Sequence, residues 1–253
     1  MNLKKILNCF FSCLFCHKNV FLFKKICSSC EALFVKIPVD QSCVRCLLPL
    51  KKIEIANDRR CGRCLNLNIN ISYDQILSPF YYNKALSRSI SAFKFKKNLS
   101  IGKYLTEQLI AFLEDKKIKE NYKAPDLIIP VPLHRKRLFF RGFNQSYLIA
   151  KWVSKNKNKN KNKKFKIKID NFILKRVHYQ RPQLGLTRKK RKENILNNFE
   201  LDMKKLNKNK PKSVAVVDDV VTTGATMEAI CLLLKKAGIE RVDIWCLART
   251  KLS

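Results

Sequence analysis

Apolar and polar residues follow two different periods along the last two thirds of the chain. Helical spacing of apolar residues predicts four helices, over 84–95, 102–117, 143–153 and 226–238. Short runs that are apolar on both faces predict three buried strands, over 124–133, 212–219 and 241–248. The stretches 66–82 and 165–174 alternate, as an opening strand or hairpin and a further strand do. Strands that alternate with helices in this way indicate an α/β fold with a parallel sheet between helices.

The first quarter of the chain has almost no helical periodicity and holds most of the cysteines. Of the eleven cysteines, eight form four C-x-x-C pairs: Cys13/Cys16, Cys27/Cys30, Cys43/Cys46 and Cys61/Cys64. Two such turns place four thiolates around one tetrahedral zinc ion, which can hold together a small segment that lacks a core of its own. We therefore predict one or two structural zinc sites, each with four cysteine ligands.

Sequential pairing of these turns gives two sites. The later one, from Cys43 to Cys64, has the clearer ribbon knuckles, and the earlier one is open to being degenerate or interleaved with it. Disulfides suit the chain less, because its remainder has the character of a cytosolic protein, and a redox C-x-x-C motif usually comes singly. The isolated Cys9, Cys231 and Cys246 are expected to be apolar residues with free thiols.

The change of composition after these cysteines divides the chain into two predicted domains. Residues 1–68 form a cysteine-rich double zinc-ribbon domain, and residues 69–253 form the larger α/β domain. Within the larger domain, the Lys/Asn run over 155–164 cannot bury apolar surface and predicts a solvated surface loop. Nonspecific contact with phosphate groups is the alternative interpretation of this run.

The chain is strongly basic, with 53 Lys and Arg against 19 Asp and Glu and a formal net charge of +34. Such a charge attracts polyanions, namely nucleic acid, anionic lipid or phosphorylated substrates, although drift in composition explains it equally well. No apolar run reaches the roughly 18 residues that cross a bilayer. The start, MNLKKILNCFFSCLFC, has no small-residue cleavage site. We expect a cytoplasmic protein, and peripheral contact with the inner membrane stays open.

Two adjacent carboxylates, Asp218 and Asp219, end the apolar run over 212–219. Because ligands of open parallel sheets bind at the carboxyl ends of strands, this pair is expected to face a crevice. The turn TTGAT then leads into a helix whose first N–H groups are free and whose dipole end is positive, which suits a phosphate. Carboxylates suit vicinal hydroxyls, directly or through magnesium. The sequence therefore predicts a site for a phosphorylated sugar.

Other phosphate-binding motifs do not match this turn. A Walker P-loop needs a lysine after its last glycine, and none follows Gly224. A dinucleotide fingerprint needs three spaced glycines, and the turn has one. A haloacid-dehalogenase nucleophile needs a second Asp two residues after the first, whereas these two are adjacent. A plain strand–turn–helix leaves the acids unexplained, because buried carboxylates without compensation are costly.

The run VVDDVVTTGAT closely resembles the 5-phosphoribosyl diphosphate (PRPP) loop of type I phosphoribosyltransferases. By that resemblance, Asp218 and Asp219 bind the ribose hydroxyls and magnesium. The resemblance assigns the 5-phosphate to Thr222, Thr223, Gly224, Ala225 and Thr226. Over nearly the whole chain, IIPVPLHRKRLFFRGFNQS, RPQLGLTRKKRKENI and the cysteine-rich front resemble the ComF/GntX family of competence-associated, phosphoribosyltransferase-like proteins. The implied fold is a type I phosphoribosyltransferase domain that follows a zinc ribbon.

Two basic segments are candidates for binding the diphosphate of PRPP. The first follows a strand end and offers the cations Arg135, Lys136, Arg137 and Arg141. The second resembles the flexible loop that closes over PRPP and offers Arg181, Gln183, Arg188 and Arg191, each of which equally suits a solvated loop. His134 is a candidate for acid–base work or for a structural role, and Asn144 for a helix cap or a ligand.

The resemblance implies two classes of function. One is a protein of DNA uptake in natural transformation, which handles single-stranded DNA at the inner face of the membrane, with a competence helicase as a candidate partner. Its basic loops, together with the aromatic residues Phe93, Phe95, Phe139 and Phe140, are candidates for holding single strands. The other is an active PRPP-dependent transferase of nucleotide metabolism, which displaces diphosphate from an anomeric carbon. The sequence has no recognisable element for an acceptor base, so turnover itself stays open.

Overall fold

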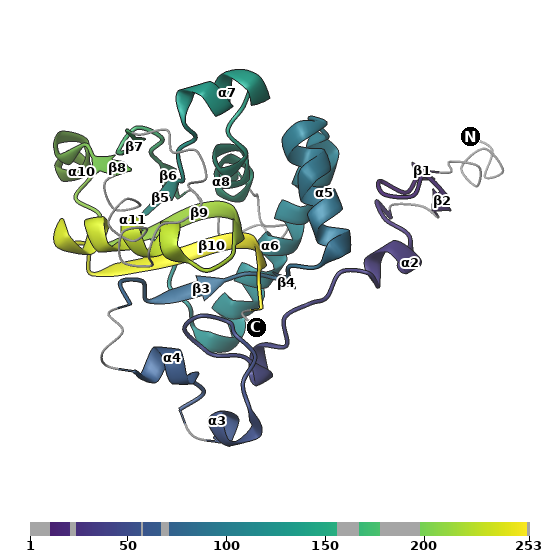
Figure 1. Cartoon of the computed structure of the whole chain (residues 1–253), viewed down its shortest axis with the longest axis horizontal. Coiled ribbons are helices and arrows are strands. Elements are labelled where there is room, and N and C mark those ends of the chain that lie inside the picture. Colours follow the sequence, from purple (N-terminus) through teal and green to yellow (C-terminus); the bar gives the residue numbers. More distant parts are fainter. Residues whose placement is uncertain are drawn as a thin grey trace, which may run out of the picture.

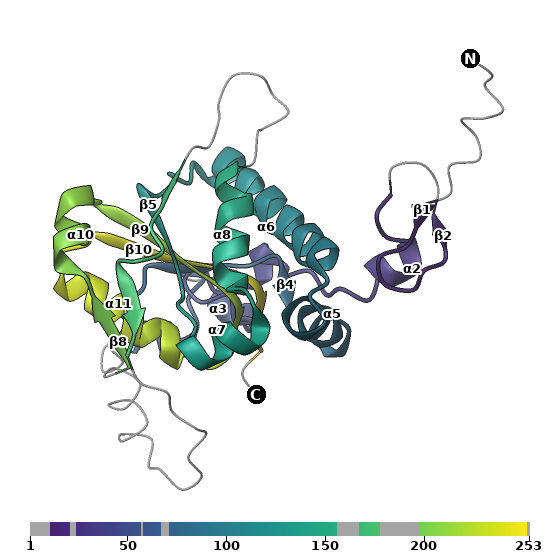
Figure 2. The same cartoon turned by 90° about the horizontal axis from the view of Figure 1, so that it is seen from above.

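A computed structural model describes residues 11–20, 24–56, 58–66, 71–155, 167–177 and 198–251. A parallel β-sheet lies at its centre and helices cover both faces (Figure 1 and Figure 2), so the predicted α/β class is confirmed. Each helix within these ranges is too short or too polar to span a bilayer.

Five of the six strands of the sheet lie in the order β3 (Gln75–Leu77), β10 (Arg241–Arg249), β9 (Ser213–Val221), β5 (Leu127–Pro130) and β6 (Lys168–Ile169). All neighbouring pairs are parallel, and β4 (Phe80–Tyr81) pairs with the end of β10. The central strands β9 and β10 are buried along almost their whole length. Strands covered on both faces need apolar residues at successive positions, which is why their sequences do not alternate.

Two of the predicted strands have a different arrangement from the one expected. The stretch 66–82 forms β3 and β4, which both run parallel to β10 and therefore make no hairpin. The stretch 165–174 contains β6 and the start of β7 (Leu174–Arg176), which pairs antiparallel with β8 (Phe199–Leu201). Between them the Asp170 carboxylate accepts hydrogen bonds from the N–H groups of Phe172 and Ile173, at 2.7 and 3.0 Å, and this turn separates the two strands.

The helices divide between the two faces of the sheet (Figure 2). One face is covered by α5 (Lys84–Phe95), α6 (Leu99–Glu120) and α8 (Gln145–Lys155), and the other by α10 (Met203–Asn209) and α11 (Ala225–Lys236). The four predicted helices are confirmed. The sequence did not predict α10 or α7 (Arg135–Arg141), because seven residues are too few to show a helical period.

Strand β9 supplies two separate apolar cores, one on each face. Val214 and Val216 pack in the core beneath α11, and Ala215 and Val217 pack in the core beneath α6 and α8. Successive side chains of a strand point to opposite faces, so each core takes every second residue. The register that seats these four residues also fixes the position of the next two residues of β9, Asp218 and Asp219.

Two similar cysteine-rich segments precede the sheet. The first ribbon (Cys13 to Cys30) contains β1 (Phe11–Ser12), β2 (Asn19–Val20) and α2 (Ser28–Glu31). The second ribbon (Cys43 to Cys64) contains α3 (Lys52–Ala56) and α4 (Gly62–Leu65), and the short helix η1 (Val39–Gln41) precedes it.

The two ribbons are attached to the sheet in different ways. The first stands to one side in Figure 1 and touches α6, where Phe15 packs on Tyr104 with 5.8 Å between ring centroids and Lys25 pairs with Glu107. The second lies beside β3, and its four cysteines belong to the same apolar core as α11. The second ribbon is therefore built into the body that carries the end of β9.

Candidate functional site

The acid pair lies where β9 extends beyond the end of its neighbour β5. The ladder between β5 and β9 ends with Pro130 opposite Val217, and the N–H of Val131 then donates to Val217 at 2.9 Å. On the other side, β9 stays paired with β10 as far as Val221. Asp218 and the residues after it therefore leave one edge of β9 free, at the carboxyl end of the sheet where ligands of this fold class bind.

Asp218 is held by α8 and by its own backbone. Its Oδ1 accepts hydrogen bonds from the Ser146 hydroxyl at 2.8 Å and from the N–H of Asp219 at 2.9 Å. Burial raises the pKa of Asp218, and the Ser146 bond and nearby cations oppose that rise. Asp218 is half-buried, so its carboxylate has lost part of the hydration that it would have in solution.

Asp219 is almost completely buried and forms an ion pair with Lys94, the next-to-last residue of α5. Its other carboxylate oxygen accepts a hydrogen bond from the N–H of Val220 at 3.0 Å. Burial lowers the pKa of Lys94 to about 8, Asp218 opposes that shift, and Arg141 and Arg137 add to it. Lys94 is a site residue that sequence reasoning missed, because a lysine in the last turn of a helix is ordinary in such a position.

Two arginines complete the charge around Asp218. Arg141, at the end of α7, donates to the Gln145 side chain at 2.7 Å and stacks over the Phe95 ring at 4.9 Å. Arg176, at the end of β7, lies over the Phe199 ring at 5.5 Å, and its buried Nε has no hydrogen-bond partner among the described residues. Burial and the charge of Arg137 lower the pKa of both arginines. A guanidinium that has a free buried donor and lies beside other cations is suited to binding an anion.

The structure thus gathers part of the predicted diphosphate set. Arg137 and Arg141 lie close enough to Lys94 to affect its pKa, and Arg141 is half-buried there. Arg135, Lys136 and Arg137 are all exposed on α7. The candidates Arg181, Gln183, Arg188 and Arg191 lie outside the described residues, as does most of the Lys/Asn run. Sequence reasoning also missed Arg176, which follows an ordinary strand pattern.

His134 and Asn144 have structural contacts at the two ends of this segment. The Nδ1 of His134 accepts a hydrogen bond from the N–H of Lys136 at 3.2 Å and caps α7. The Asn144 Oδ1 accepts a hydrogen bond from the N–H of Ser146 at 2.9 Å, and this bond caps α8. The Asn144 amide also donates to the carbonyl of Val131 at 3.0 Å, which ties this helix to the end of β5. These bonds place Ser146 beside Asp218.

The turn after β9 forms an open cup at the start of α11. Gly224 has φ +84°, in the left-handed region, and a side chain built on it would meet only open space. Thr222, Thr223 and Ala225 are exposed, and Thr226 is half-buried in the first turn of α11. The N-terminus of this twelve-residue helix has a positive dipole end, and within the turn the N–H of Ala225 donates to the Thr223 hydroxyl at 3.4 Å. The cup lies on the same strand end as the acid pair, as the sequence predicted.

The eight C-x-x-C cysteines form two clusters, and each cluster combines two pairs that are consecutive in the sequence. In each cluster the four sulfur atoms lie within 4.8 Å of one another. The Sγ atoms of Cys16 and Cys27 are 3.6 Å apart, and those of Cys46 and Cys61 are 3.5 Å apart. Tetrahedral zinc with bonds of about 2.3 Å needs sulfur atoms about 3.8 Å apart, so both sets fit the ion.

The local geometry of the two clusters is also the same. Cys27 donates its N–H to the sulfur of Cys13, and Cys61 donates its N–H to the sulfur of Cys43, both at 3.4 Å. The cysteines that the structure describes form no disulfides, and Cys231 and Cys246 are buried as expected. Cys9 lies outside the described residues.

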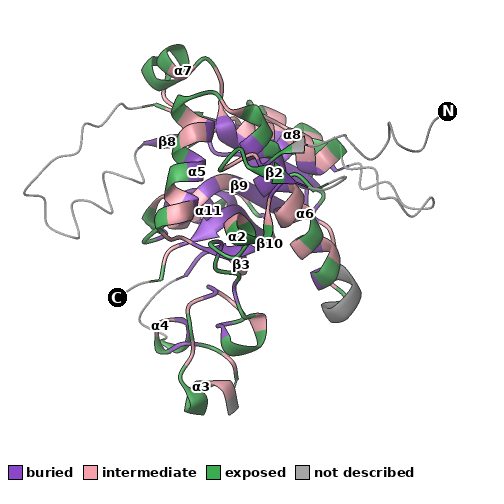
Figure 3. Ribbon diagram, turned by 90° about the vertical axis from the view of Figure 1, so that its right-hand side faces the viewer, coloured by how far each residue is buried: buried purple, intermediate pink, exposed green. Residues whose placement is uncertain are grey.

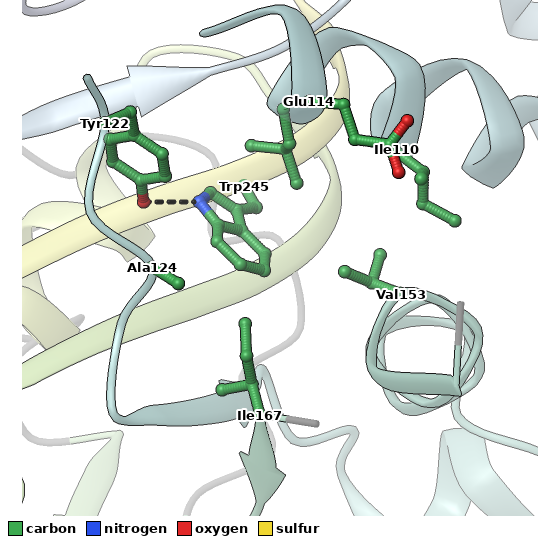
Figure 4. Close-up of a pocket in the computed structure, with 8 residues that line it drawn as sticks. Ile110, Glu114, Tyr122, Ala124, Val153, Ile167 and Trp245 are labelled. Atoms are coloured by element: carbon green, nitrogen blue, oxygen red, sulfur yellow. Dashed lines mark hydrogen bonds between the residues drawn. The ribbon is translucent and has the colours of Figure 1, made fainter. Parts of the chain in front are cut away.

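A small cavity at the opposite end of the sheet is unsuited to a phosphorylated sugar (Figure 4). Its volume is about 30 Å³, and it lies near Ala124 and Ile167, which precede β5 and β6. Its lining is mostly apolar, and the indole N–H of Trp245 donates to the Tyr122 hydroxyl at 3.2 Å. The cavity is therefore a packing feature of the core beneath α6.

Comparison with known proteins connects the site to a family. Residues 157–252 match the phosphoribosyl transferase domain family. The chain is 34% identical over 240 residues to competence protein F of Haemophilus influenzae, which covers 94% of this chain and 97% of that protein. It is 30% identical over 208 residues to DNA utilization protein YhgH of Escherichia coli K12, with 82% and 84% covered. It is 26% identical over 255 residues to competence protein ComFC of Bacillus subtilis, with 90% and 96% covered.

We expect Lys94→Met to raise the pKa of Asp218 further, because the variant removes a nearby positive charge that now lowers it. The Asp218 carboxyl would then stay protonated to a higher pH in the folded protein than in the unfolded chain. The free energy of unfolding should accordingly fall as the pH rises through that interval. Carboxyl-carbon NMR titration measures the shift, and Lys96→Met, at the exposed end of the same helix, is the control. An unchanged pKa of Asp218 in Lys94→Met would contradict the electrostatic arrangement.

We expect about two zinc ions per purified chain, one for each cluster. Cys43→Ser/Cys46→Ser should reduce this to about one and lower the melting temperature, since structural zinc contributes folding free energy. Elemental analysis by mass spectrometry gives the count. A wild-type value near one would show that one cluster does not retain metal.

Proposed function

The chain belongs to the ComF family of phosphoribosyltransferase-like proteins, and we propose that it binds PRPP at the end of β9 and acts on single-stranded DNA in competence-related uptake. The observation that carries the first part is the joint placement of an acid pair and an open phosphate cup on one strand end. A sugar phosphate carries both hydroxyls and a phosphate on one small molecule. The surrounding cations then suit its remaining negative charge.

In the proposed complex, each part of PRPP meets a different part of the site. Asp218 and Asp219 bind the ribose 2- and 3-hydroxyls, and the turn from Thr222 to Thr226 binds the 5-phosphate. Arg137, Arg141 and Arg176 face the diphosphate. Asp218 and Asp219 would also hold a magnesium ion that accompanies the diphosphate, and such an ion supplies charge neutralisation. The ion pair between Lys94 and Asp219 supports this assignment, because a cation already lies against the acid pair.

Transfer from PRPP would break the bond between the anomeric carbon and the diphosphate oxygen, and the electron pair would leave with the diphosphate. The arginines would stabilise that leaving charge. The carboxylates would stabilise the positive charge that develops on the sugar ring. The binding site therefore has groups that would stabilise both the leaving diphosphate and the sugar ring. These groups do not determine which nucleophile attacks.

The DNA role rests on the relatives and on one exposed surface. The relatives carry the names competence protein and DNA utilization protein, which favour DNA handling over a transferase confined to nucleotide metabolism. Helix α7 follows the carboxyl end of β5 and is largely exposed (Figure 3). We place the protein's action on the cytoplasmic side of the inner membrane, where a competence helicase is the candidate partner.

The exposed surface, which we call the α7 surface, combines aromatic rings with cations. Phe139 and Phe140 are 86% and 83% exposed, and Phe95, whose ring lies under Arg141 of the same helix α7, is 70% exposed. Arg135, Lys136 and Arg137 lie in the same helix. Nucleic-acid bases stack on aromatic rings while the cations bind the phosphates, which is how sequence-tolerant proteins hold single strands. Phe93, the fourth aromatic candidate, is fully buried and belongs to the core, so its predicted stacking role is wrong.

Asp218→Asn/Asp219→Asn should abolish measurable PRPP binding in isothermal titration calorimetry with magnesium, because neutral amides neither hold the cation nor match the hydroxyls as well. Asp40→Asn/Asp115→Asn removes the same charge from exposed positions and should bind as the wild type does. Normal PRPP binding by the first variant would remove the site assignment.

Phe139→Ala/Phe140→Ala should weaken binding of single-stranded DNA by about 1–3 kcal/mol for each stacked base, with little change in the dependence on salt. Arg135→Gln/Lys136→Gln should instead reduce that salt dependence, because fewer phosphates are neutralised. Fluorescence anisotropy at two salt concentrations separates the two effects. Phe172→Ala, an exposed phenylalanine in another part of the surface, is the control. A wild-type affinity that is indifferent to salt would contradict electrostatic binding.

A further inference from the structure

The second ribbon is bonded to the backbone of the phosphate cup through a buried arginine. Arg249, the last residue of β10, is 0% exposed. Its Nε donates to the carbonyl of Cys46 at 3.1 Å, and its Nη1 donates to the carbonyls of Val221, at 3.1 Å, and of Thr222. One guanidinium therefore joins a cluster cysteine to the last residue of β9 and to the first residue of the cup.

The other half of the same cluster reaches the next residue of the cup. Arg63 lies between Cys61 and Cys64 in α4, and its Nη1 donates to the carbonyl of Thr223 at 3.4 Å. Each C-x-x-C turn of the second cluster is thus linked by hydrogen bonds to part of the cup, one through Arg249 and one through Arg63. The first ribbon touches α6 instead.

The direction of these carbonyls decides what the cup presents. A trans peptide directs its C=O and its N–H to opposite sides of the chain. Because the carbonyls of Thr222 and Thr223 face the arginines, the N–H groups of Thr223 and Gly224 face the other way. A phosphate bound in the turn would need its donors on that side.

We propose that the second cluster positions the phosphate cup through Arg249 and Arg63, so that metal binding by Cys43, Cys46, Cys61 and Cys64 controls the affinity for the 5-phosphate. Metal fixes the carbonyl of Cys46 and the α4 turn, and these fix the two arginines. Without it, Arg249 loses a firm acceptor and the cup peptides are free to rotate. The inference rests on the proposed phosphosugar site and adds that binding at this site depends on a metal cluster.

The sharpest test compares matched losses of one cluster each. Cys43→Ser/Cys46→Ser should weaken calorimetric binding of ribose 5-phosphate by about 10- to 100-fold, the range expected when charge-assisted bonds that order a binding loop are lost. Cys13→Ser/Cys16→Ser loses the other metal and should bind as the wild type does. Equal affinities for ribose 5-phosphate in these two variants would overturn the proposal.

Two arginine variants keep the test valid if the second-cluster variant does not fold. Arg63→Gln and Arg249→Lys should retain zinc yet bind ribose 5-phosphate less tightly, about 3- to 10-fold for the half-exposed Arg63. Arg45→Gln is the control, because Arg45 lies in the same cluster but donates to the carbonyls of Ile71 and Tyr73. Unchanged affinity in Arg63→Gln and Arg249→Lys would also overturn the proposal.

A second ligand distinguishes positioning from general loss of structure. Inorganic diphosphate, which we assign to the arginines near α7, should bind these variants as it binds the wild type. Equal weakening of both ligands would indicate collapse of the site and overturn the positioning role. Failure of the zinc-loaded wild type to bind ribose 5-phosphate would instead refute the proposed function.

Discussion

The cost of placing two carboxylates at the end of a buried strand is the constraint on which the site depends. Asp218 and Asp219 continue a strand whose preceding residues fill two apolar cores, so the register of β9 delivers them to one fixed place. Carboxylates in such surroundings require hydrogen bonds and cations. Ser146, Lys94 and Arg176 supply them from α8, α5 and β7, which lie far apart in sequence.

This constraint explains which parts of the site were predictable. The acid pair, the threonines and Gly224 form one continuous run, in which a strand pattern, a turn glycine and a helix start are local signals. Lys94 and Arg176 end segments whose patterns indicate only a helix and a strand. Their roles arise from the packing of α5 and β7 around the end of β9, and one sequence carries no local signal for such contacts. The sequence did not show with which strands β3, β4 and β6 pair, for the same reason.

The ribbons show the same division between local and distant information. The spacing of the cysteines predicts one or two zinc sites, because a C-x-x-C turn needs only its own residues to present two sulfurs, but it leaves open whether the earlier site is intact or interleaved with the later one. Their different attachments follow from other residues: Phe15 and Lys25 hold the first ribbon on α6, while Arg249 holds the second against β9. The predicted division at residues 68 and 69 remains a prediction, and the second cluster shares its core with α11 across that position.

The balance of charge in the site narrows the chemistry of its ligand. Lys94, Arg141 and Arg176 bring more positive charge than the two carboxylates neutralise, so a neutral sugar would leave cations without partners. Free diphosphate alone would leave the carboxylates and the cup unused. A ligand that carries hydroxyls between a single phosphate and a diphosphate satisfies all three groups at once. A magnesium ion carried by that ligand would compete with Lys94 for Asp219. The lysine, which pairs with Asp219 in this structure, would then be available to the ligand's own negative charge.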